Sequence, residues 1–366
     1  MELHISRDAL LKPLQHIGSV VERRQTLPIL SHILFHAEQE RLTITGTDLE
    51  VEATAFIPLD NATPGITTLP ARKMLDICRA LPDGAQLSFT KDGERTTVTS
   101  GKSRFVLNAL STKDFPSTGD IHPVVTFTIG QERLKEHIER TQFAMAQQDV
   151  RYYLNGLLLE VEGQHLRTVA TDGHRLAICD SDENDNVDNN QQVIIPRKGV
   201  VELSRLLESN EVVVRVEIGQ NHIRLITDQI CFTSKLIDGR FPDYQRVMPE
   251  KITGHLIADR EMITQALVRA SILSNEKYRG VRLELGENVL KIGANNPDQE
   301  EAHEEIEVAF QGEAMEIGFN ATYLLDALNA IKTEQVQIGL LDASSCCVLQ
   351  GVGDEKSRYI VMPMRL

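Results

Sequence analysis

The length, composition and charge of the chain set the first limits on its class. It has 366 residues, of which 41% are hydrophobic and 25% charged, and its formal net charge is −15. This length predicts about two or three globular domains. No run approaches the roughly 18–20 apolar residues of a membrane span, and the N-terminus is acidic rather than apolar. We therefore expect a cytoplasmic protein without a signal peptide or membrane anchor.

The negative charge is concentrated in two short segments. Residues 180–190 and 298–307 together contain eleven Asp and Glu side chains and no Lys or Arg, so the rest of the chain is closer to neutral. A phosphate responds to charge within about 10 Å. The net charge therefore argues against indiscriminate nucleic-acid binding, but it does not exclude a local DNA-binding surface.

The five cysteines are scattered, odd in number and without a C-x-x-C pair: Cys78, Cys179, Cys231, Cys346 and Cys347. We expect reduced, mostly buried thiols and no metal or redox role. The sequence predicts no cofactor.

Taken in chain order, the predicted elements repeat about every 125 residues. A strand-like start followed by an amphipathic helix occurs at 5–11, 127–134 and 256–263, with a polar residue that can cap each helix. A second helix opens at 70–73, 196–199 and 320–323, at offsets of 126 and 124 residues. Proline opens the first two of these and suits a first helical turn. Between the helices, Thr47-Asp48, Thr171-Asp172 and Asn295-Asn296 lie 124 residues apart.

The remaining segments mostly alternate apolar and polar residues, as at 42–45, 212–218 and 281–285. Such alternation is typical of half-buried antiparallel strands. Each repeat therefore has two helices and about eight short strands, with the helices on one face of the sheet. The predicted fold class is α+β, in three similar domains at 1–124, 125–250 and 251–366. Chance coincidence of turn residues is the alternative.

Motifs that resemble catalytic sites fail at key positions. Gly101-Lys102-Ser103 lacks the earlier glycine of a phosphate-binding loop, because Thr96 stands there. His303 opens a pattern like that of a zinc-protease helix, but Glu307 replaces the second histidine. Neither pattern predicts an active site.

Other acidic patterns have a structural explanation. Asp48 and Asp172 occupy equivalent places in the repeat, as turn residues do, so together with Asp243 they do not indicate a metal-dependent polymerase site. The segment 171–175 combines an acid, a histidine and a base, but neighbours in a turn need not converge as a catalytic triad. We expect no catalytic or metal-binding residue; a nucleotidyltransferase is the alternative from another class.

Positive charge gathers on the predicted helices. Residues 71–80 and 196–205 each contain three bases against one acid, and the first helix and its exit add Arg7, Lys12, Arg23 and Arg24. Basic helices beside acidic loops indicate one phosphate-facing surface and a repelling exterior; a solvated helix surface is the alternative. The segment 147–153 combines amides, a base and two tyrosines, which can touch phosphates and stack on bases.

Several longer strings resemble the beta subunits of bacterial DNA polymerase III, the DNA sliding clamps. They are TLPIL at 26–30, TGTDLE at 45–50, QDVRYYLNG at 148–156, ATDGHRL at 170–176, DGRFPDY at 238–244, LSNEK at 273–277 and VMPMRL at 361–366. The resemblance extends over the whole chain. It implies three similar DNA-clamp domains per chain and a head-to-tail homodimer, closed into a ring with helices lining the hole and sheets outside. Such a ring is a non-catalytic processivity factor.

The resemblance also implies the DNA contacts, at Arg24, Arg72, Gln148, Tyr152 and Tyr153. So few contacts suit a ring that slides on duplex DNA without sequence specificity. Each neutralised phosphate would steepen the salt dependence of binding and slow the sliding, so retention must come from topology.

A hydrophobic cleft between the second and third domains is the partner site that the resemblance implies. Its residues here would be Arg151, Leu154, Thr171, Gly173, His174, Arg175, Leu176, Pro242, Arg246, Val247, Asn320, Tyr323, Ser344, Val361, Met362, Pro363, Met364, Arg365 and Leu366. Methionines and a proline would give an adaptable floor for short peptides. Ser344 replaces an aliphatic residue of the family and Cys346 a serine, which bears on depth and peptide preference.

The implied partners of this cleft are the polymerase III alpha subunit, the clamp loader delta subunit, other polymerases and mismatch-repair proteins, each through a short clamp-binding peptide. The implied subunit interface places Lys73, Ile77, Phe105 and Leu107 of one chain against Ile272, Leu273, Glu300, Glu301 and Glu304 of the other. His303 replaces an acid of the family, so we expect a missing or pH-dependent ion pair there. A scaffold of three repeats that does not bind DNA is a further alternative.

Overall fold

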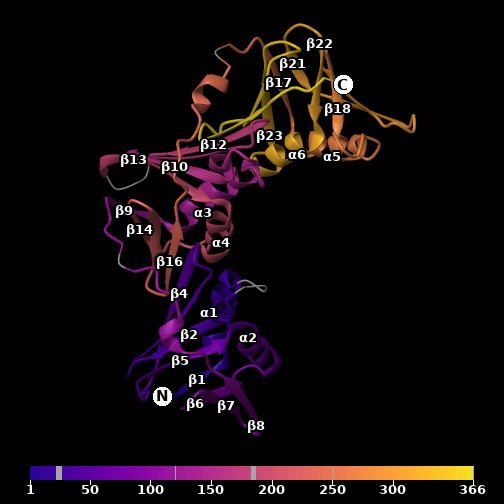
Figure 1. Ribbon diagram of the computed structural model, residues 1–366. Coiled ribbons are helices and arrows are strands. Elements are labelled where there is room, and N and C mark those ends of the chain that lie inside the picture. Colours follow the sequence, from indigo (N-terminus) through magenta and orange to yellow (C-terminus); the bar gives the residue numbers. More distant parts are fainter. Residues whose placement is uncertain (22–26, 120, 183–186, 250, 366) are drawn as a thin grey trace. The chain divides into compact units, whose positions relative to one another are not determined.

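The computed structural model describes residues 1–21, 27–119, 121–182, 187–249 and 251–365. These residues form two compact units (Figure 1). The first unit comprises residues 1–135, 185–189 and 198–236, and the second comprises 136–184, 190–197 and 237–366. Each unit is described by itself.

The described elements follow one order three times. The first repeat runs through β1 (Glu2–Ser6), α1 (Arg7–Val20), β2 (His32–Ala37), β3 (Arg41–Thr47), β4 (Val51–Pro58), β5 (Gly65–Pro70), α2 (Ala71–Ala80), β6 (Gln86–Asp92), β7 (Arg95–Ser100) and β8 (Ser103–Asn108). The second runs through β9 (Val125–Gly130), α3 (Gln131–Thr141), β10 (Gly156–Gly163), β11 (His165–Thr171), β12 (Arg175–Ser181), β13 (Val187–Pro196), α4 (Arg197–Leu206), β14 (Val213–Ile218), β15 (His222–Ile226) and β16 (Ile230–Lys235).

The third repeat adds one short strand to the same order. It runs through β17 (Gly254–Asp259), α5 (Arg260–Ser271), β18 (Gly280–Gly286), β19 (Val289–Asn295), β20 (Glu301–Glu307), β21 (Ala309–Gln311), β22 (Met315–Asn320), α6 (Ala321–Ala330), β23 (Gln335–Leu340), β24 (Cys347–Gly351) and β25 (Ser357–Val361). The predicted repeat of two helices and about eight strands is therefore confirmed in the described residues.

Each repeat divides its strands between two sheets. The first unit contains an eight-stranded sheet in the order β5-β2-β3-β4-β16-β15-β14-β9 and a four-stranded sheet in the order β1-β6-β7-β8. The second unit contains a nine-stranded sheet in the order β13-β10-β11-β12-β25-β24-β23-β17-β21 and a four-stranded sheet in the order β20-β19-β18-β22. Helices lie against one face of these sheets: α1 packs on β3 and β4, and α5 on β19 and β20.

Each large sheet is formed where strands of adjacent repeats pair. β4 pairs with β16 in the eight-stranded sheet, and β12 pairs with β25 in the nine-stranded sheet. Both junctions are antiparallel and have the same register, since Val51 lies opposite Ser234 and Arg175 opposite Val361. The same additional backbone bond closes each one: Lys235 donates to the Glu50 carbonyl at 2.9 Å, and Met362 to the His174 carbonyl at 2.9 Å. β8 and β20 are each an end strand of a four-stranded sheet and pair on one side only, as the other end strands of the described sheets do.

Local sequence explains where the helices begin. The Ser6 hydroxyl accepts a hydrogen bond from the Ala9 amide, and the Asp259 carboxylate accepts one from the Met262 amide, so the predicted caps of two helices are confirmed. Asn320 caps α6 in the same way. The prediction that proline occupies a first helical turn is wrong by one position. Pro70 precedes α2 in extended conformation, with a φ of −60° and a ψ of 113°, and ends a strand instead.

The repeated Thr-Asp pairs form the expected turns. Asp48 accepts from the amides of Glu50 and Val51 at 2.9 and 2.8 Å. Asp172 accepts from the amides of His174 and Arg175 at 2.9 and 3.1 Å. Both carboxylates thus satisfy backbone donors, which confirms the structural reading of these acids.

Other features of the chain agree with its composition. All five cysteines are free thiols, three of them buried, as expected, and burial raises the pKa of Cys78 to about 12. No helix in the described residues is long and apolar enough to cross a membrane.

Replacement of Lys198 by Met is expected to destabilise the first unit. Lys198 forms an ion pair with Asp48, whose side chain is 3% exposed, and the substitution would leave a buried carboxylate without this partner. The expected loss in the free energy of unfolding is roughly 2–4 kcal/mol, measured by urea denaturation. Addition of Asp48→Asn, which removes the buried charge, should restore most of it. An unchanged midpoint for Lys198→Met would contradict the importance of the pair.

Candidate partner cleft and ring surfaces

A cavity of about 170 Å³ lies in the second unit, beside the β12–β25 junction. It is lined by Arg151, Tyr153, Leu154, Thr171, Gly173, Arg175, Leu176, Pro242, Asp243, Tyr244, Val247 and Met362. Nine of these twelve are residues predicted for the cleft. Segments far apart in the sequence therefore converge here: the 151–154 turn, the 171–176 turn, the linker after β16 and the C-terminal end of β25.

The wall formed by the linker packs on one face of the nine-stranded sheet. Phe241 and Tyr244 are buried there against Leu158, Leu176 and Ile360. The Tyr244 hydroxyl donates to Glu160 at 2.5 Å and accepts from Arg167 at 3.0 Å. Burial and the Glu160 contact raise the pKa of Tyr244 to about 12, so the phenol stays protonated and the linker is held to the sheet.

A second wall comes from the turn between β11 and β12. Gly173 has a φ of 89°, in the left-handed region that favours glycine. A Cβ atom there would lie 3.1 Å from the Arg151 guanidinium nitrogens. Leu49 occupies the equivalent place in the first repeat with a φ of 79°, so this turn can hold a side chain. Gly173 leaves room for Arg151.

The Arg151 guanidinium is held by its neighbours. It donates to both carboxylate oxygens of Asp149, at 3.0 and 2.8 Å, and to the Asp172 carbonyl at 3.2 Å. The Asp149 pKa falls to about 2, because the carboxylate accepts from the Arg151 side chain and amide. Asn155 closes the loop by hydrogen bonds to the Asp149 backbone in both directions, at 2.9 and 2.8 Å.

Several predicted cleft residues lie outside the cavity lining but hold its surroundings. The His174 ring stacks on Tyr323, with ring centroids 6.2 Å apart, and Asn320 caps the helix that carries Tyr323. Val361 is buried and pairs with Arg175. Met364 donates to the Gly318 carbonyl at 2.9 Å.

The remaining predicted cleft residues have other neighbours or surroundings. Ser344 is exposed and donates to Asp342 at 2.8 Å. Nearby Cys346 instead packs against the buried cluster that contains Phe241 and Tyr244. Arg246 is exposed and pairs with Asp243 at 2.9 Å. Pro363 is half-buried, Arg365 is exposed, and Leu366 lies outside the described residues.

The residues predicted to contact DNA differ in exposure. Arg72 is exposed on α2, with Asp76 at 3.8 Å, and Gln148 is exposed with a φ of 56°. Tyr152 is 56% exposed, whereas the ring of Tyr153 contacts it edge-on and lines the cavity. Arg24 lies outside the described residues.

The predicted interface residues lie on and beside β8 and β20, two of the strands that end a sheet. Phe105 and Leu107 point inward from β8, and Lys73 and Ile77 lie on α2. At the other end of the chain, Ile272 is 71% exposed just after α5. Leu273 is half-buried beside it, and Glu300 and Glu301 are exposed.

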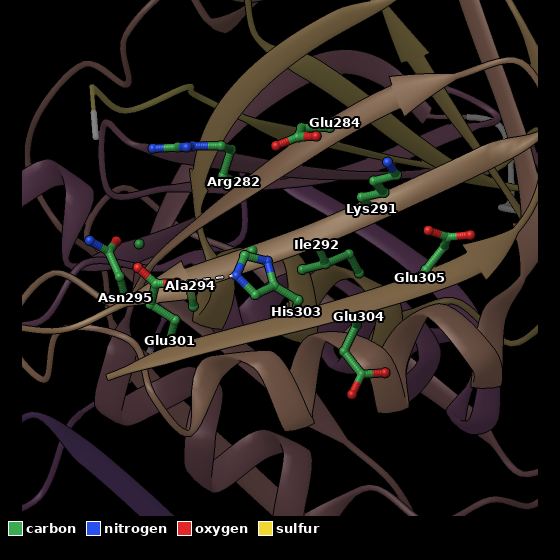
Figure 2. Close-up of a pocket in the computed structure, with 12 residues that line it drawn as sticks. Arg282, Glu284, Lys291, Ile292, Ala294, Asn295, Glu301, His303, Glu304 and Glu305 are labelled. Atoms are coloured by element: carbon green, nitrogen blue, oxygen red, sulfur yellow. Dashed lines mark hydrogen bonds and ion pairs between the residues drawn. The ribbon is translucent and has the colours of Figure 1, made fainter. Parts of the chain in front are cut away.

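A hollow of about 300 Å³ lies on the face of β18, β19 and β20 that is opposite α5 (Figure 2). His303 points toward Glu301 there, at 3.4 Å, among the outward side chains of Arg282, Lys291 and Glu305. Glu304 points away from this face and pairs with Arg269 at 2.6 Å. His303 thus lies on a strand, so the arrangement of a zinc-protease helix does not occur.

The sequence reasoning missed three cavity-lining residues, Tyr153, Asp243 and Tyr244. Asp243 and Tyr244 stand inside the DGRFPDY string at 238–244, which could have indicated them.

Comparison with known proteins agrees with this fold, which is that of DNA sliding clamps. Family models of the DNA polymerase III beta subunit match the N-terminal domain at residues 1–119, the central domain at 128–243 and the C-terminal domain at 245–365. The beta sliding clamps of Pseudomonas putida and Escherichia coli K12 are each 51% identical over the whole of both chains. A crystal structure of the Pseudomonas aeruginosa clamp bound to griselimycin matches with a TM-score of 0.98 at 50% identity, over 100% of both chains.

The chain belongs to the beta-subunit family of DNA polymerase III. Its fold is the three-domain clamp fold, and its function is that of a sliding clamp for this polymerase. Such a clamp is a processivity factor and a non-catalytic subunit.

Gly173→Ala is expected to destabilise the second unit by about 1 kcal/mol or more, because the new Cβ meets Arg151 and the φ is positive. Gly353→Ala is the matched control, since its φ is also positive, at 82°, and its Cβ would meet nothing within 4 Å. Urea unfolding of both variants checks this. Equal stability of the two would contradict the assigned role of Gly173.

Proposed function

We propose that two copies of the chain close head to tail into a ring around duplex DNA, without sequence specificity. Each of the two described junctions joins a strand of one repeat to a strand of the next with the same register. In the order of elements within a repeat, β8 takes the same place as β16 and β25, and β20 takes the same place as β4 and β12. A third junction therefore needs β20 of one protomer and β8 of another, which would also cover two exposed edges.

The equivalence of the repeats supplies the register of this third junction. Thr54 lies opposite Cys231, and Ile178 opposite Arg358; the equivalent pair between protomers is His303 and Arg104. With this register Phe105 faces Ala302, both on the inner face, and Val106 faces Glu301 on the outer face. The burial alternation of both strands supports this, because half-buried Phe105 then lies opposite half-buried Ala302, on the face that also carries Leu107 and Ile306.

Helices contribute to the same junction. In the first unit the Ser19 hydroxyl, at the end of α1, donates to Glu202 of α4 at 2.6 Å. In the repeat, Ile272 after α5 takes the place of Ser19, and Asp76 of α2 takes the place of Glu202. Ile272 and its neighbour Leu273 would therefore meet the surface of α2, which carries Lys73 and Ile77. The high exposure of Ile272 supports this contact, as an apolar interface centre. Glu300, Glu301 and Glu304 would flank it.

We further propose that the DNA faces the five residues that the resemblance to sliding clamps implies: Arg24, Arg72, Gln148, Tyr152 and Tyr153. Exposure of Arg72, Gln148 and Tyr152 supports this role. The ring would work in the cytoplasm, where bacterial polymerase III copies DNA, with domains at 1–124, 125–250 and 251–366.

The cleft, in this proposal, docks short peptides of the polymerase III alpha subunit, the clamp loader delta subunit, other polymerases and mismatch-repair proteins. Apolar Leu154, Leu176, Pro242, Val247 and Met362 in its lining support an apolar peptide. The Pseudomonas aeruginosa relative binds griselimycin, and we expect this chain to bind it as well.

Retention on nicked circular DNA tests the ring directly. The clamp is loaded with a clamp loader and ATP, washed at high salt and followed before and after the circle is cut. Retention on circles and loss from linear ends are expected, because a closed ring is held by topology. Equal loss from both would contradict it. A purified chain that incorporates nucleotides would favour the enzyme alternative instead.

The register also predicts that acid weakens the dimer. His303 would face Arg104 of the partner and lies among Arg282, Lys291, Glu284, Glu301 and Glu305 of its own sheet. Protonated His303 would meet the Arg104 cation only in the dimer, and this repulsion opposes association in acid. The dimer should therefore be more stable at pH 8 than at pH 5.5. The dissociation constant should rise roughly tenfold between pH 8 and pH 5.5, since two interfaces contribute.

Sedimentation of the wild type and of His303→Gln over this pH range checks the prediction. The Gln variant should lose most of the pH dependence, and His303→Glu should tighten the dimer by pairing with Arg104. Equal dissociation constants of the wild type at both pH values would contradict it.

A further inference from the structure

One side chain of the cleft, Arg175, reaches from the second repeat to the helix α6 of the third. Its guanidinium pairs with Asp326 of α6 and with Asp172 at 3.1 Å. It also donates to the Phe143 carbonyl at 2.8 Å. The group lies 4.6 Å from the centroid of the Tyr323 ring and 5.4 Å from that of Phe143. Arg175 is therefore held by two carboxylates, a carbonyl oxygen and two aromatic rings while it lines the cavity.

Asp326 and Phe143 do not line the cavity, whereas Arg175 does. The Asp326 side chain is one-third exposed and that of Arg175 12% exposed. Any effect of Asp326 on a bound peptide must therefore pass through Arg175 or through α6. The first junction lacks this arrangement, because Val51 stands at the equivalent place.

The contacts also decide the charge that the cleft presents. Each of its two guanidinium groups is neutralised by carboxylates outside the lining: Arg151 by Asp149, and Arg175 by Asp172 and Asp326. The third charged lining residue, Asp243, pairs with Arg246 at 2.9 Å. A peptide thus meets apolar side chains and cations whose charge is already balanced, which disfavours selection for acidic groups.

We propose that Asp326 is a positioning residue that sets the charge preference of the cleft. It holds the Arg175 guanidinium between the rings of Phe143 and Tyr323 and balances its charge, so the cleft prefers neutral apolar peptides. This inference rests on the proposed peptide-docking function.

Peptide binding to the full-length Asp326→Asn variant tests the inference. The probes are two synthetic hexapeptides of apolar residues that differ only by Asp or Asn at one central position. The Asn peptide should bind the variant about threefold to tenfold more weakly than the wild type. The Asp peptide should lose less or gain, so the affinity ratio shifts at least about threefold toward the acidic peptide.

Three controls separate this role from a loss of folding. Asp326→Glu should keep the wild-type ratio, because it keeps the charge. Glu316→Gln, which removes an ion pair with Arg282 at 3.1 Å in the same repeat, should change neither affinity. In an Arg175→Gln background, Asp326→Asn should add no further shift.

An unchanged ratio in Asp326→Asn, or equal loss of both peptides with a lowered melting temperature, would overturn the positioning role. Failure of the wild type to bind either peptide or griselimycin would overturn the proposed cleft function, and this inference with it.

Discussion

Backbone pairing between strands of adjacent repeats is the interaction on which the rest of this molecule depends. The β4–β16 and β12–β25 ladders turn sheets of single repeats into sheets of eight and nine strands. Their register is fixed because a shift by one residue would move each buried side chain to the other face. The same pairing leaves β8 and β20 with one free edge each, and a ring of two chains would use both. The architecture, the partner site and the proposed assembly thus follow from one repeated contact.

Side chains make the two junctions chemically different although their backbones agree. At the first, the Asp48–Lys198 pair bridges adjacent repeats, while Leu49, Glu52 and Lys235 stand where the second has Gly173, Leu176 and Met362. The second is bridged by Arg175 and Asp326. The second junction thus has a glycine and two apolar residues where the first has a leucine and two charged residues. This difference makes the hollow beside the second junction apolar. The repeated backbone therefore provides the frame, and a few different side chains beside one turn form the cleft.

Much of this could be predicted from the sequence. The spacing of Thr47-Asp48 and Thr171-Asp172 indicated the repeat, because Asx turns are encoded locally, and nine of twelve cavity residues followed from motifs that resemble the clamp family. Placement of Tyr153 in the cavity wall could not be predicted, since it depends on the 237–248 linker that packs across the sheet. Nor could the Arg175–Asp326 pair, because 151 positions separate its partners. The exposed position of Ser344, whose hydroxyl donates a hydrogen bond to Asp342, likewise depends on a turn that the sequence pattern did not indicate.

The central claim is that the junction within the chain is used again between chains, and a cross-link measures it most directly. A double variant, Arg104→Cys with His303→Cys, is oxidised under conditions in which the wild-type cysteines stay reduced. The account predicts a covalent dimer with two cross-links, because residues directly opposite in antiparallel strands lie within disulfide reach. Ser103→Cys with His303→Cys, one residue out of register, should cross-link far less. Efficient linkage of the shifted pair alone, or of neither pair, would contradict the repeated junction.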